Sequence, residues 1–369
     1  MVDLNELLRH AAERRASDVH VSPGSRPWLR LDGEVANTAF DVAEAADIER
    51  IVAQVLPPER SDQLTRTGEV DFVLTAGDGV RFRVKVFRHR RTLGLVLRLV
   101  PATVPGFDSL GLPVVVRRLA DEPRGLVLVT GPTGSGKTTT VAAIVDHINE
   151  TAARHIVTVE DPVEFLHTPK RSFVTQREVG TDTPDLRSGL RGVLRLDPDV
   201  LVIGELSDRD AVRAALTAAA AGHLVISALP ATSATETVLR IIELFPPHEQ
   251  RPVRTALADC LRWIVSQRLL ERVDGKGRIP AVEVLMATGR VFDKIVNGDE
   301  TSELEQVIAE GEYYGMQTFD QSLFGLHKNG LIGLRDALAS ASHPHDLRIA
   351  LQQAGLPVGS LDPAAANSW

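Results

Sequence analysis

The sequence of 369 residues contains a single cysteine, Cys260. One thiol can form neither an intrachain disulfide nor a four-cysteine zinc site. Disulfide-stapled secreted domains are therefore excluded, and a reducing cytoplasm is the expected compartment. The apolar neighbours Leu257, Leu261 and Ile264 predict that Cys260 is a buried core residue rather than a catalytic one.

Long apolar runs are also missing. The most apolar stretch, residues 211–231, is interrupted by Arg213, His223 and Pro230, and a bilayer-spanning helix needs roughly 20 apolar residues. Met1 leads into polar, helix-like sequence rather than into a signal peptide. We therefore expect a cytoplasmic protein that reaches a membrane only through partners.

Aromatic residues are scarce, and acidic residues outnumber basic ones, 49 to 41. Aromatic residues make up 4% of the chain and the net charge is -8, whereas nucleic-acid-binding proteins usually present a broad basic surface. A ring could still hide a basic channel inside an acidic exterior. Lysine is rare, with 6 residues against 35 arginines, so each lysine inside a motif is informative.

The length of the chain is sufficient for two globular domains.

The first hundred residues favour a small α+β domain. Residues 2–15 place leucines and alanines on one helical face, and a second helix is expected between Val42 and Leu56. Alternating stretches predict antiparallel strands at Val19–Val21, Trp28–Leu31, Val70–Leu74, Val80–Val86 and Leu93–Leu99. We assign residues 1–100 to this domain and the segment 101–113, which is rich in proline and glycine, to an interdomain linker.

Beyond the linker, short and nearly continuous apolar runs alternate with helix-like segments. The runs are Leu126–Val129, Ile156–Val159, Val200–Ile203 and Leu224–Ile226. Continuous apolar strands between helices indicate a parallel sheet that is covered on both faces. We assign residues 114–290 to this core, 291–350 to a helical C-terminal region and 351–369 to a flexible tail.

The segment from Gly131 to Thr138, GPTGSGKT, fits the phosphate-binding pattern GxxxxGK[ST]. An apolar strand precedes it and an amphipathic helix follows it, which argues against the alternative of a glycine-rich surface turn. Glycines let successive backbone N–H groups point at phosphates, and the helix start adds its positive dipole end. Lys137 can reach the β- and γ-phosphates, and the Thr138 hydroxyl can bind Mg²⁺.

This pattern predicts an ATP-binding site with Mg²⁺ as the metal. The residues expected to bind the nucleotide are Gly131, Pro132, Thr133, Gly134, Ser135, Gly136, Lys137, Thr138 and Thr139.

Two of the apolar strands end in glutamate, Glu160 and Glu205. In a parallel sheet, strand ends beside the phosphate-binding loop line the nucleotide crevice. A carboxylate there can hold Mg²⁺ through water or accept a proton from attacking water. We predict that Glu160 is the water-activating base and Glu205 the metal-side carboxylate, although the roles could be shared or exchanged. The alternative for each glutamate is a solvated or helix-capping acid.

His223 precedes another apolar strand. Taken alone, a histidine in this position is more often a core residue with its hydrogen bonds made inside the protein than a functional residue.

The order of the motifs resembles the type II/type IV secretion ATPase superfamily. The segments that carry the resemblance are GPTGSGKTTT (131–140), TVEDPVEF (158–165), QREVG (176–180), LRLDPDVLVIGE (194–205) and GHLV (222–225). Further segments resemble its PilT-type pilus retraction branch: ASDVHVS (16–22), RFRVKVF (81–87), GMQTFDQSL (315–323) and GLI (330–332). The lack of an extra N-terminal domain and of a four-cysteine site also favours that branch.

The resemblance implies an α/β protein, with a small N-terminal α+β domain of PAS-like fold, a RecA-like P-loop core and a helical C-terminal region. It implies a homohexamer that hydrolyses MgATP to drive type IV pilus retraction. The implied partners are an inner-membrane platform protein of the pilus and paralogous pilus ATPases, with no nucleic acid. Glu160, Glu205 and His223 fall in the family's Asp box, Walker B motif and His box, and Arg83 and Arg98 are candidates for N-domain arginines that reach the nucleotide.

Two positions depart from the family's pattern. Pro230 stands where the His box carries a second histidine, and Leu206-Ser207-Asp208 replaces a Met-Arg-Asp-like run. Proline offers no side-chain donor and no N–H, and loss of one preorganised donor typically lowers kcat by roughly 10²–10³. A nucleotide-binding regulatory or structural ring with weak turnover is therefore the alternative to a motor. A nucleic-acid translocase is a third possibility, against which the acidic charge and scarce aromatic residues count.

Overall fold

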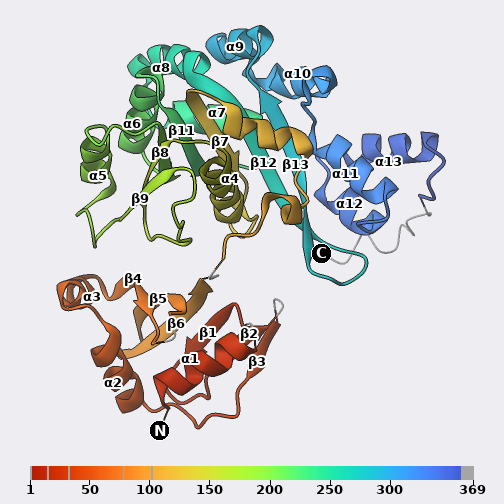
Figure 1. Cartoon of the computed structure of the whole chain (residues 1–369). Coiled ribbons are helices and arrows are strands. Elements are labelled where there is room, and N and C mark those ends of the chain that lie inside the picture. Colours follow the sequence, from red (N-terminus) through yellow and green to blue (C-terminus); the bar gives the residue numbers. More distant parts are fainter. Residues whose placement is uncertain (1, 15, 32–33, 78, 101–102, 359–369) are drawn as a thin grey trace. The chain divides into compact units, whose positions relative to one another are not determined.

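The computed structural model describes residues 2–14, 16–31, 34–77, 79–100 and 103–358 (Figure 1). The chain forms two compact units, Met1–Val104 with Pro162–Leu166, and Pro105–Asp161 with His167–Trp369. The division after Val104 falls in the segment predicted to be a linker, of which residues 101–102 lie outside the described part.

The first unit contains an antiparallel six-stranded sheet in the order β3-β2-β1-β6-β5-β4. The strands are β1 (Asp18–Val21), β2 (Trp28–Leu31), β3 (Glu34–Asn37), β4 (Glu69–Thr75), β5 (Arg81–His89) and β6 (Thr92–Val100). The helices are α1 (Leu4–Glu13), α2 (Ala45–Val55), the 3₁₀ turn η1 (Pro58–Arg60) and α3 (Ser61–Thr67). In β5, Phe82, Val84 and Val86 are buried and alternate with partly exposed charged residues, as expected for a strand with one face on a core.

The expected α+β character of this unit is confirmed, and each predicted strand and helix is present. The strand β3 and the helix α3 were not predicted. Glu34–Asn37 is a largely exposed edge strand without apolar alternation, and Ser61–Thr67 buries only Leu64. Neither segment carries the hydrophobic pattern on which a prediction from sequence depends.

The second unit is built on a seven-stranded sheet in the order β13-β12-β7-β11-β10-β8-β9. The strands are β7 (Gly125–Thr130), β8 (His155–Glu160), β9 (Phe173–Glu178), β10 (Val200–Glu205), β11 (Leu224–Leu229), β12 (Leu261–Glu271) and β13 (Arg278–Met286). All neighbouring pairs are parallel except β12–β13. The predicted parallel core is thus confirmed, and it continues into an antiparallel pair at one side.

Two 3₁₀ helices precede the first parallel strand, and α-helices follow the strands. They are η2 (Phe107–Leu110), η3 (Val114–Asp121), α4 (Lys137–Thr151), α5 (Leu186–Val193), α6 (Arg209–Ala220), α7 (Ala234–Glu243) and α8 (Pro247–Cys260). Both α4 and α6 pack against β7 and β11. Cys260, at the end of α8, is buried as expected.

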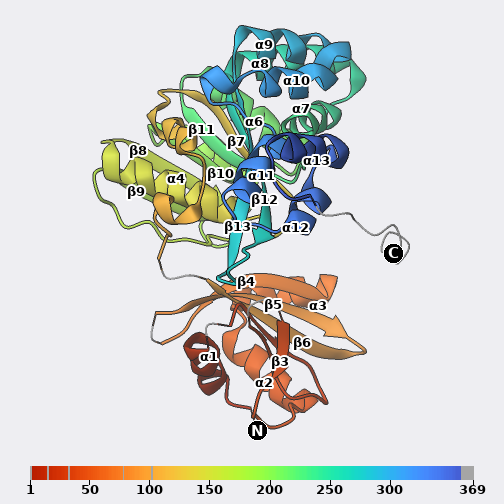
Figure 2. The same cartoon turned by 90° about the vertical axis from the view of Figure 1, so that its right-hand side faces the viewer.

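The C-terminal part of this unit is helical. It comprises α9 (Gly289–Val296), η4 (Gly298–Glu303), α10 (Leu304–Ala309), η5 (Glu312–Tyr314), α11 (Phe319–Lys328), α12 (Leu334–Ser340) and α13 (Pro344–Gln353). Figure 2 shows α11 and α12 beside β12 and β13, where Phe319 and Leu323 pack on Ile279 and Ala281. The helix α13 continues to Gln353, inside the segment predicted to be a tail, and residues 359–369 lie outside the described part. None of the described helices is long and apolar enough to cross a bilayer.

Candidate nucleotide-binding site

The loop from Gly131 to Thr138, called here the phosphate-binding loop, joins the fully buried strand β7 to α4, which begins at Lys137. Gly131, Gly134 and Gly136 have φ values of 148°, 81° and 87°, in the region that only glycine enters readily. A Cβ on Gly131 would lie 2.4 Å from both the carbonyl oxygen of Gln267 and the hydroxyl of Ser135. The loop therefore requires glycine for its backbone and for its packing.

Polar groups of the loop are arranged to receive an anion. The Lys137 ammonium donates to the carbonyl oxygens of Gly131 and Pro132, at 2.9 and 3.1 Å. The Ser135 hydroxyl is buried, and it makes no hydrogen bond to the part of the chain that the structure describes. Phosphate oxygens would offer the ammonium stronger, charge-assisted acceptors. The loop therefore fits the nucleotide phosphates that its sequence predicts.

The side chain of Gln267, on β12, supports the loop from the neighbouring strand. Its amide nitrogen donates to the Ser135 carbonyl at 2.6 Å, and its amide oxygen accepts from the Thr140 hydroxyl at 3.0 Å. Next to it, Ser266 accepts a hydrogen bond from Thr130 at 2.8 Å. Sequence reasoning missed these contacts. Two adjacent polar residues inside the apolar run LRWIVSQRLL were the available signal.

The two strand-end glutamates lie at the same edge of the sheet as the loop. Glu160 ends β8 and Glu205 ends β10, and these strands are hydrogen-bonded neighbours in parallel register. The register of β10 against β11 shifts between Ile203 and Glu205. A Cβ on the intervening Gly204 would lie 3.4 Å from the Cα of Glu160. The structure thus brings both carboxylates to the carboxyl edge of the sheet, and Glu205 is exposed there.

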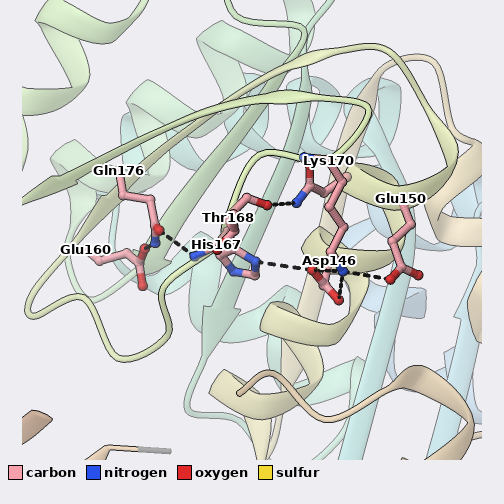
Figure 3. Close-up of polar contacts among 8 residues, drawn as sticks. Asp146, Glu150, Glu160, His167, Thr168, Lys170 and Gln176 are labelled. Atoms are coloured by element: carbon pink, nitrogen blue, oxygen red, sulfur yellow. Dashed lines mark hydrogen bonds and ion pairs between the residues drawn. The ribbon is translucent and has the colours of Figure 1, made fainter. Parts of the chain in front are cut away.

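Side chains on β8 and β9 hold the carboxyl group of Glu160. Its Oε1 accepts a hydrogen bond from the Thr158 hydroxyl at 2.7 Å and one from the Gln176 amide at 3.3 Å. Figure 3 shows Gln176 reaching Glu160 from β9. The orientation of this carboxyl group is therefore fixed by β8 and β9 together.

The same network continues to the helix that carries Lys137. Gln176 accepts a hydrogen bond from the backbone N–H of His167 at 2.8 Å, and the His167 ring faces Asp146 on α4, with Nδ1 and Oδ1 3.9 Å apart (Figure 3). Lys170 completes the cluster, with its ammonium 2.9 Å from Asp146 and 2.6 Å from Glu150. Burial lowers the pKa of His167, against the opposing effect of the Asp146 carboxylate. The segment 167–170 is thereby held against α4 by polar contacts.

Pro230 lies beside the start of the phosphate-binding loop. Leu229, the last residue of β11, pairs in register with Thr130, the last residue of β7, and Pro230 follows directly. Its carbonyl accepts a hydrogen bond from Arg240 at 2.6 Å. Proline in place of the expected histidine therefore lies at the edge of the sheet where the nucleotide phosphates are expected to bind.

The other departure from the family's pattern follows Glu205. Leu206 is buried and Ser207 is exposed. The Asp208 carboxylate caps α6 by accepting a hydrogen bond from Ala211 N–H at 2.8 Å. These three residues thus connect β10 to α6, and Asp208 is the N-cap of that helix.

His223 does not join this group. Leu224 begins β11 and pairs with Gly125, the first residue of β7, whereas the loop follows the last residue of β7. A strand rises about 3.3 Å per residue, so the whole length of β11 separates His223 from the loop. Its Nδ1 lies 2.7 Å from the carbonyl oxygen of Pro198. The catalytic role expected from the resemblance is therefore not supported at the nucleotide site of the same subunit.

The arginine candidates lie in the first unit. Arg83 on β5 and Arg98 on β6 are partners in register, so they lie on one face of the sheet. Arg98 donates to the buried carboxylate of Asp18 at 2.8 Å, and Arg83 lies 3.9 Å from Asp71. Both guanidinium groups are thus placed by acidic neighbours.

Within the described ranges, no group of three or more His, Cys, Asp or Glu side chains is arranged to hold a metal ion. Mg²⁺ at nucleotide sites is usually held by one or two protein ligands together with phosphates and water. The donor set of Thr138 in the first turn of α4 and Glu205 at the end of β10 fits that kind of site.

The chain matches the family described as "Type II/IV secretion system protein" over residues 1–312. This chain belongs to that family. It is 39% identical over 345 residues to the type IV pilus retraction ATPase PilT of Pseudomonas aeruginosa, covering 94% of this chain and 100% of that protein. It is 38% identical over 321 residues to the twitching motility protein of Neisseria gonorrhoeae, covering 87% and 86% of the two chains.

Solved structures of related ATPases have the same fold. The crystal structure of the pilus retraction motor PilT with bound ADP matches with a TM-score of 0.84 and 38% identity, covering 94% of this chain and 99% of that chain. The ATPase DotB of Legionella pneumophila matches with a TM-score of 0.76 and 25% identity, covering 92% and 95%. The predicted fold class, an N-terminal α+β domain and a RecA-like core with a helical C-terminal region, is confirmed.

Proposed function

We propose that this secretion-family protein is a hexameric motor ATPase that hydrolyses MgATP to drive type IV pilus retraction, as in twitching motility. One observation carries the proposal: the loop around Lys137 and the carboxylates of Glu160 and Glu205 share one edge of the sheet. The relatives named above support it, because the chain aligns with the full length of the Pseudomonas retraction ATPase.

In this proposal the loop N–H groups bind the β- and γ-phosphates, and the Lys137 ammonium leaves the loop carbonyls to neutralise them. Glu160 orients a water molecule and accepts its proton as the water oxygen attacks the γ-phosphorus and the bond to the bridging oxygen breaks. Mg²⁺, held by Thr138 and near Glu205, would supply further charge neutralisation. Arg83 and Arg98, acting from the N-terminal domain, would stabilise the transition state.

The proposed motor works as a homohexamer of two-domain subunits. Residues 101–113 form the linker on which the N-terminal domain (1–100) moves relative to the core (114–290) and the C-terminal helices (291–350). Its place is the cytoplasm, at the inner face of the cytoplasmic membrane, where a platform protein of the pilus receives the motion. A paralogous ATPase can share the task, since the chain is also 35% identical to the type IV pilus ATPase PilU. We propose no role for nucleic acid.

The second candidate function is a nucleotide-binding regulatory or structural ring with weak turnover. Pro230 favours it, because the residue stands beside the phosphate-binding loop and cannot donate a hydrogen bond there. The two functions share nucleotide binding and differ in the rate of ATP hydrolysis.

Measurement of ATP hydrolysis per subunit, as a function of protein concentration, tests the motor. If arginines from one subunit complete the site of another, the rate per subunit should rise as rings assemble, because such an arginine is typically worth roughly 10³–10⁵ in rate. A rate that stays flat through the dissociation range of the ring would contradict shared sites. Glu160→Gln is the control, which should retain ATP binding and lose turnover. In cells, the wild-type chain but not this variant should restore twitching to a strain that lacks its retraction ATPase.

A further inference from the structure

Gln267 is a polar residue in the interior of the core. It is 1% exposed, on a strand where Trp263, Ile264 and Val265 are also fully buried. A primary amide destabilises such a position unless its donors and acceptor find partners. The amide nitrogen of Gln267 donates to the Ser135 carbonyl at 2.6 Å, and its amide oxygen accepts from the Thr140 hydroxyl at 3.0 Å. Both partners belong to the nucleotide-binding segment.

The contact with Ser135 fixes the direction of the next backbone N–H. The carbonyl of Ser135 and the N–H of Gly136 belong to one trans peptide plane, in which they point in opposite directions. Because Gln267 holds the carbonyl toward β12, the N–H of Gly136 points away from β12. A left-handed glycine in such a loop contributes to the concave set of N–H groups that binds an anion, and Gly136 has φ 87°.

The contact with Thr140 fixes the helix relative to the loop. Thr140 lies in the first turn of α4, one turn after Gly136. A single side chain therefore spans the junction that contains Lys137. Any residue larger than glycine at position 136 would place its Cβ 3.1 Å from the Gln267 amide nitrogen, so the side chain and the loop are closely fitted.

We propose that Gln267 is a positioning residue of the nucleotide site: it orients the Gly136 N–H toward the β-phosphate and thereby sets the affinity for the diphosphate part of the nucleotide. The proposal rests on the nucleotide binding that the proposed function requires. Gln267 acts through the loop backbone, because its amide is already occupied by Ser135 and Thr140.

The test compares the affinities of ADP and AMP for the full-length protein by competition with a fluorescent ADP analogue. Gln267→Met preserves the length of the side chain and removes both hydrogen bonds. We expect it to weaken ADP binding by about tenfold or more, on the scale of one lost buried hydrogen bond, and to weaken AMP binding much less. A general loss of folding would weaken both nucleotides equally, so the ADP-to-AMP affinity ratio reports on the β-phosphate contact.

A matched control lies next to the site. Ser266→Ala removes the neighbouring hydrogen bond with Thr130 and leaves both bonds of the Gln267 amide in place. It should keep the wild-type ADP-to-AMP ratio within about threefold. If Gln267→Met does not fold, Gln267→Asn, whose amide is one methylene too short to span both partners, is used and should show the same lowered ratio.

An unchanged ADP-to-AMP ratio in the folded Gln267 variant would overturn the proposal while leaving the ATPase assignment intact. Failure of the wild-type protein to bind ADP would instead overturn the proposed function, and this inference with it.

Discussion

The carboxylate oxygen Oε1 of Glu283 accepts a hydrogen bond from the backbone N–H of Ala234 at 2.6 Å. Ala234 begins α7 directly after the loop that contains Pro230, and Glu283 lies in the middle of β13, 4% exposed. Burial raises the pKa of Glu283 to about 7, against the opposing effect of the Ala234 bond. Nearby Glu305 raises this pKa further, and Arg268 and Ser266 lower it.

This raised pKa predicts a pH-dependent stability. Between the ordinary pKa of 4.5 and about 7, the folded state holds the proton of Glu283 while the unfolded state has lost it, so stability should fall as pH rises through this window and level off above it. The loss amounts to about 3 kcal/mol at about 1.4 kcal/mol per pKa unit. Glu283→Gln keeps an oxygen for Ala234 N–H and cannot ionise, so it should remove this loss.

The difference in the free energy of unfolding between Glu283→Gln and wild type, measured with urea at several pH values, checks this prediction. The free energy of unfolding of Glu283→Gln, relative to that of the wild type, should increase from about pH 5 to about pH 8. A difference that is constant over this range would show that Glu283 titrates normally. Glu271→Gln, an exposed site on β12, serves as the control and should show no such trend.

The bonds from Thr158 and Gln176 to Glu160 should affect catalysis rather than binding. Thr158→Val and Gln176→Met each remove one donor that fixes the proposed base. General-base catalysis contributes roughly 10²–10⁴ in rate and depends on geometry, so each variant should lower kcat by about tenfold with little change in KM. Steady-state kinetics separate the two constants.

Thr175→Val provides a matched control on β9. Thr175 neighbours Gln176, but its hydroxyl contacts His155 at 3.1 Å. The Thr175→Val variant should leave kcat near the wild-type value. Equal losses for Thr158→Val and Thr175→Val would indicate a general loss of sheet packing instead of a specific effect on Glu160.

His223 should matter for stability and not for nucleotide affinity. His223→Ala removes the hydrogen bond to Pro198, which should reduce the free energy of unfolding by about 1 kcal/mol. ADP affinity, measured by titration calorimetry, should remain at the wild-type level because the residue lies at the opposite edge of the sheet from Lys137. Loss of ADP binding by a folded His223→Ala protein would contradict this placement.

The sequence was sufficient to predict the loop at Lys137, because phosphate binding requires glycine, lysine and hydroxyl groups at fixed spacing. It also predicted the strands that are apolar throughout. The catalytic role of His223 came from the resemblance alone, although the residue precedes its strand and a parallel sheet binds ligands at the carboxyl ends of its strands. The pairing of Leu224 with Gly125 places His223 at the amino edge of the sheet.

The antiparallel pair β12–β13 and the edge strand β9 were missed for different physical reasons. Ser266, Gln267 and Glu283 interrupt the apolar pattern of β12 and β13 with polar side chains whose partners are distant in sequence. β9 is partly exposed along its length, as an edge strand can be. The polar pair Ser266 and Gln267 was a signal in the sequence, but the partners of Gln267 could not be predicted because they are long-range tertiary contacts.

Pro230 offers the sharpest test between a motor and a weakly hydrolysing ring. It follows the residue that pairs with Thr130 at the end of β7, so a histidine side chain there would lie near the proposed γ-phosphate position. One restored donor should raise kcat by about tenfold or more if its absence limits turnover. The Pro230→His variant is compared with wild type in steady-state ATP hydrolysis at saturating ATP.

Pro230→Ala is the matched control, because it restores the backbone N–H without adding a side-chain donor. A gain in Pro230→His alone assigns the deficit to the missing imidazole, and a gain in both variants assigns it to the backbone. Brisk hydrolysis by the wild type, with no gain in either variant, would show that the loop functions with proline and would eliminate the regulatory-ring alternative. The Arg240 contact to the carbonyl of residue 230 does not depend on the side chain there, so we expect the loop to keep its position in both variants.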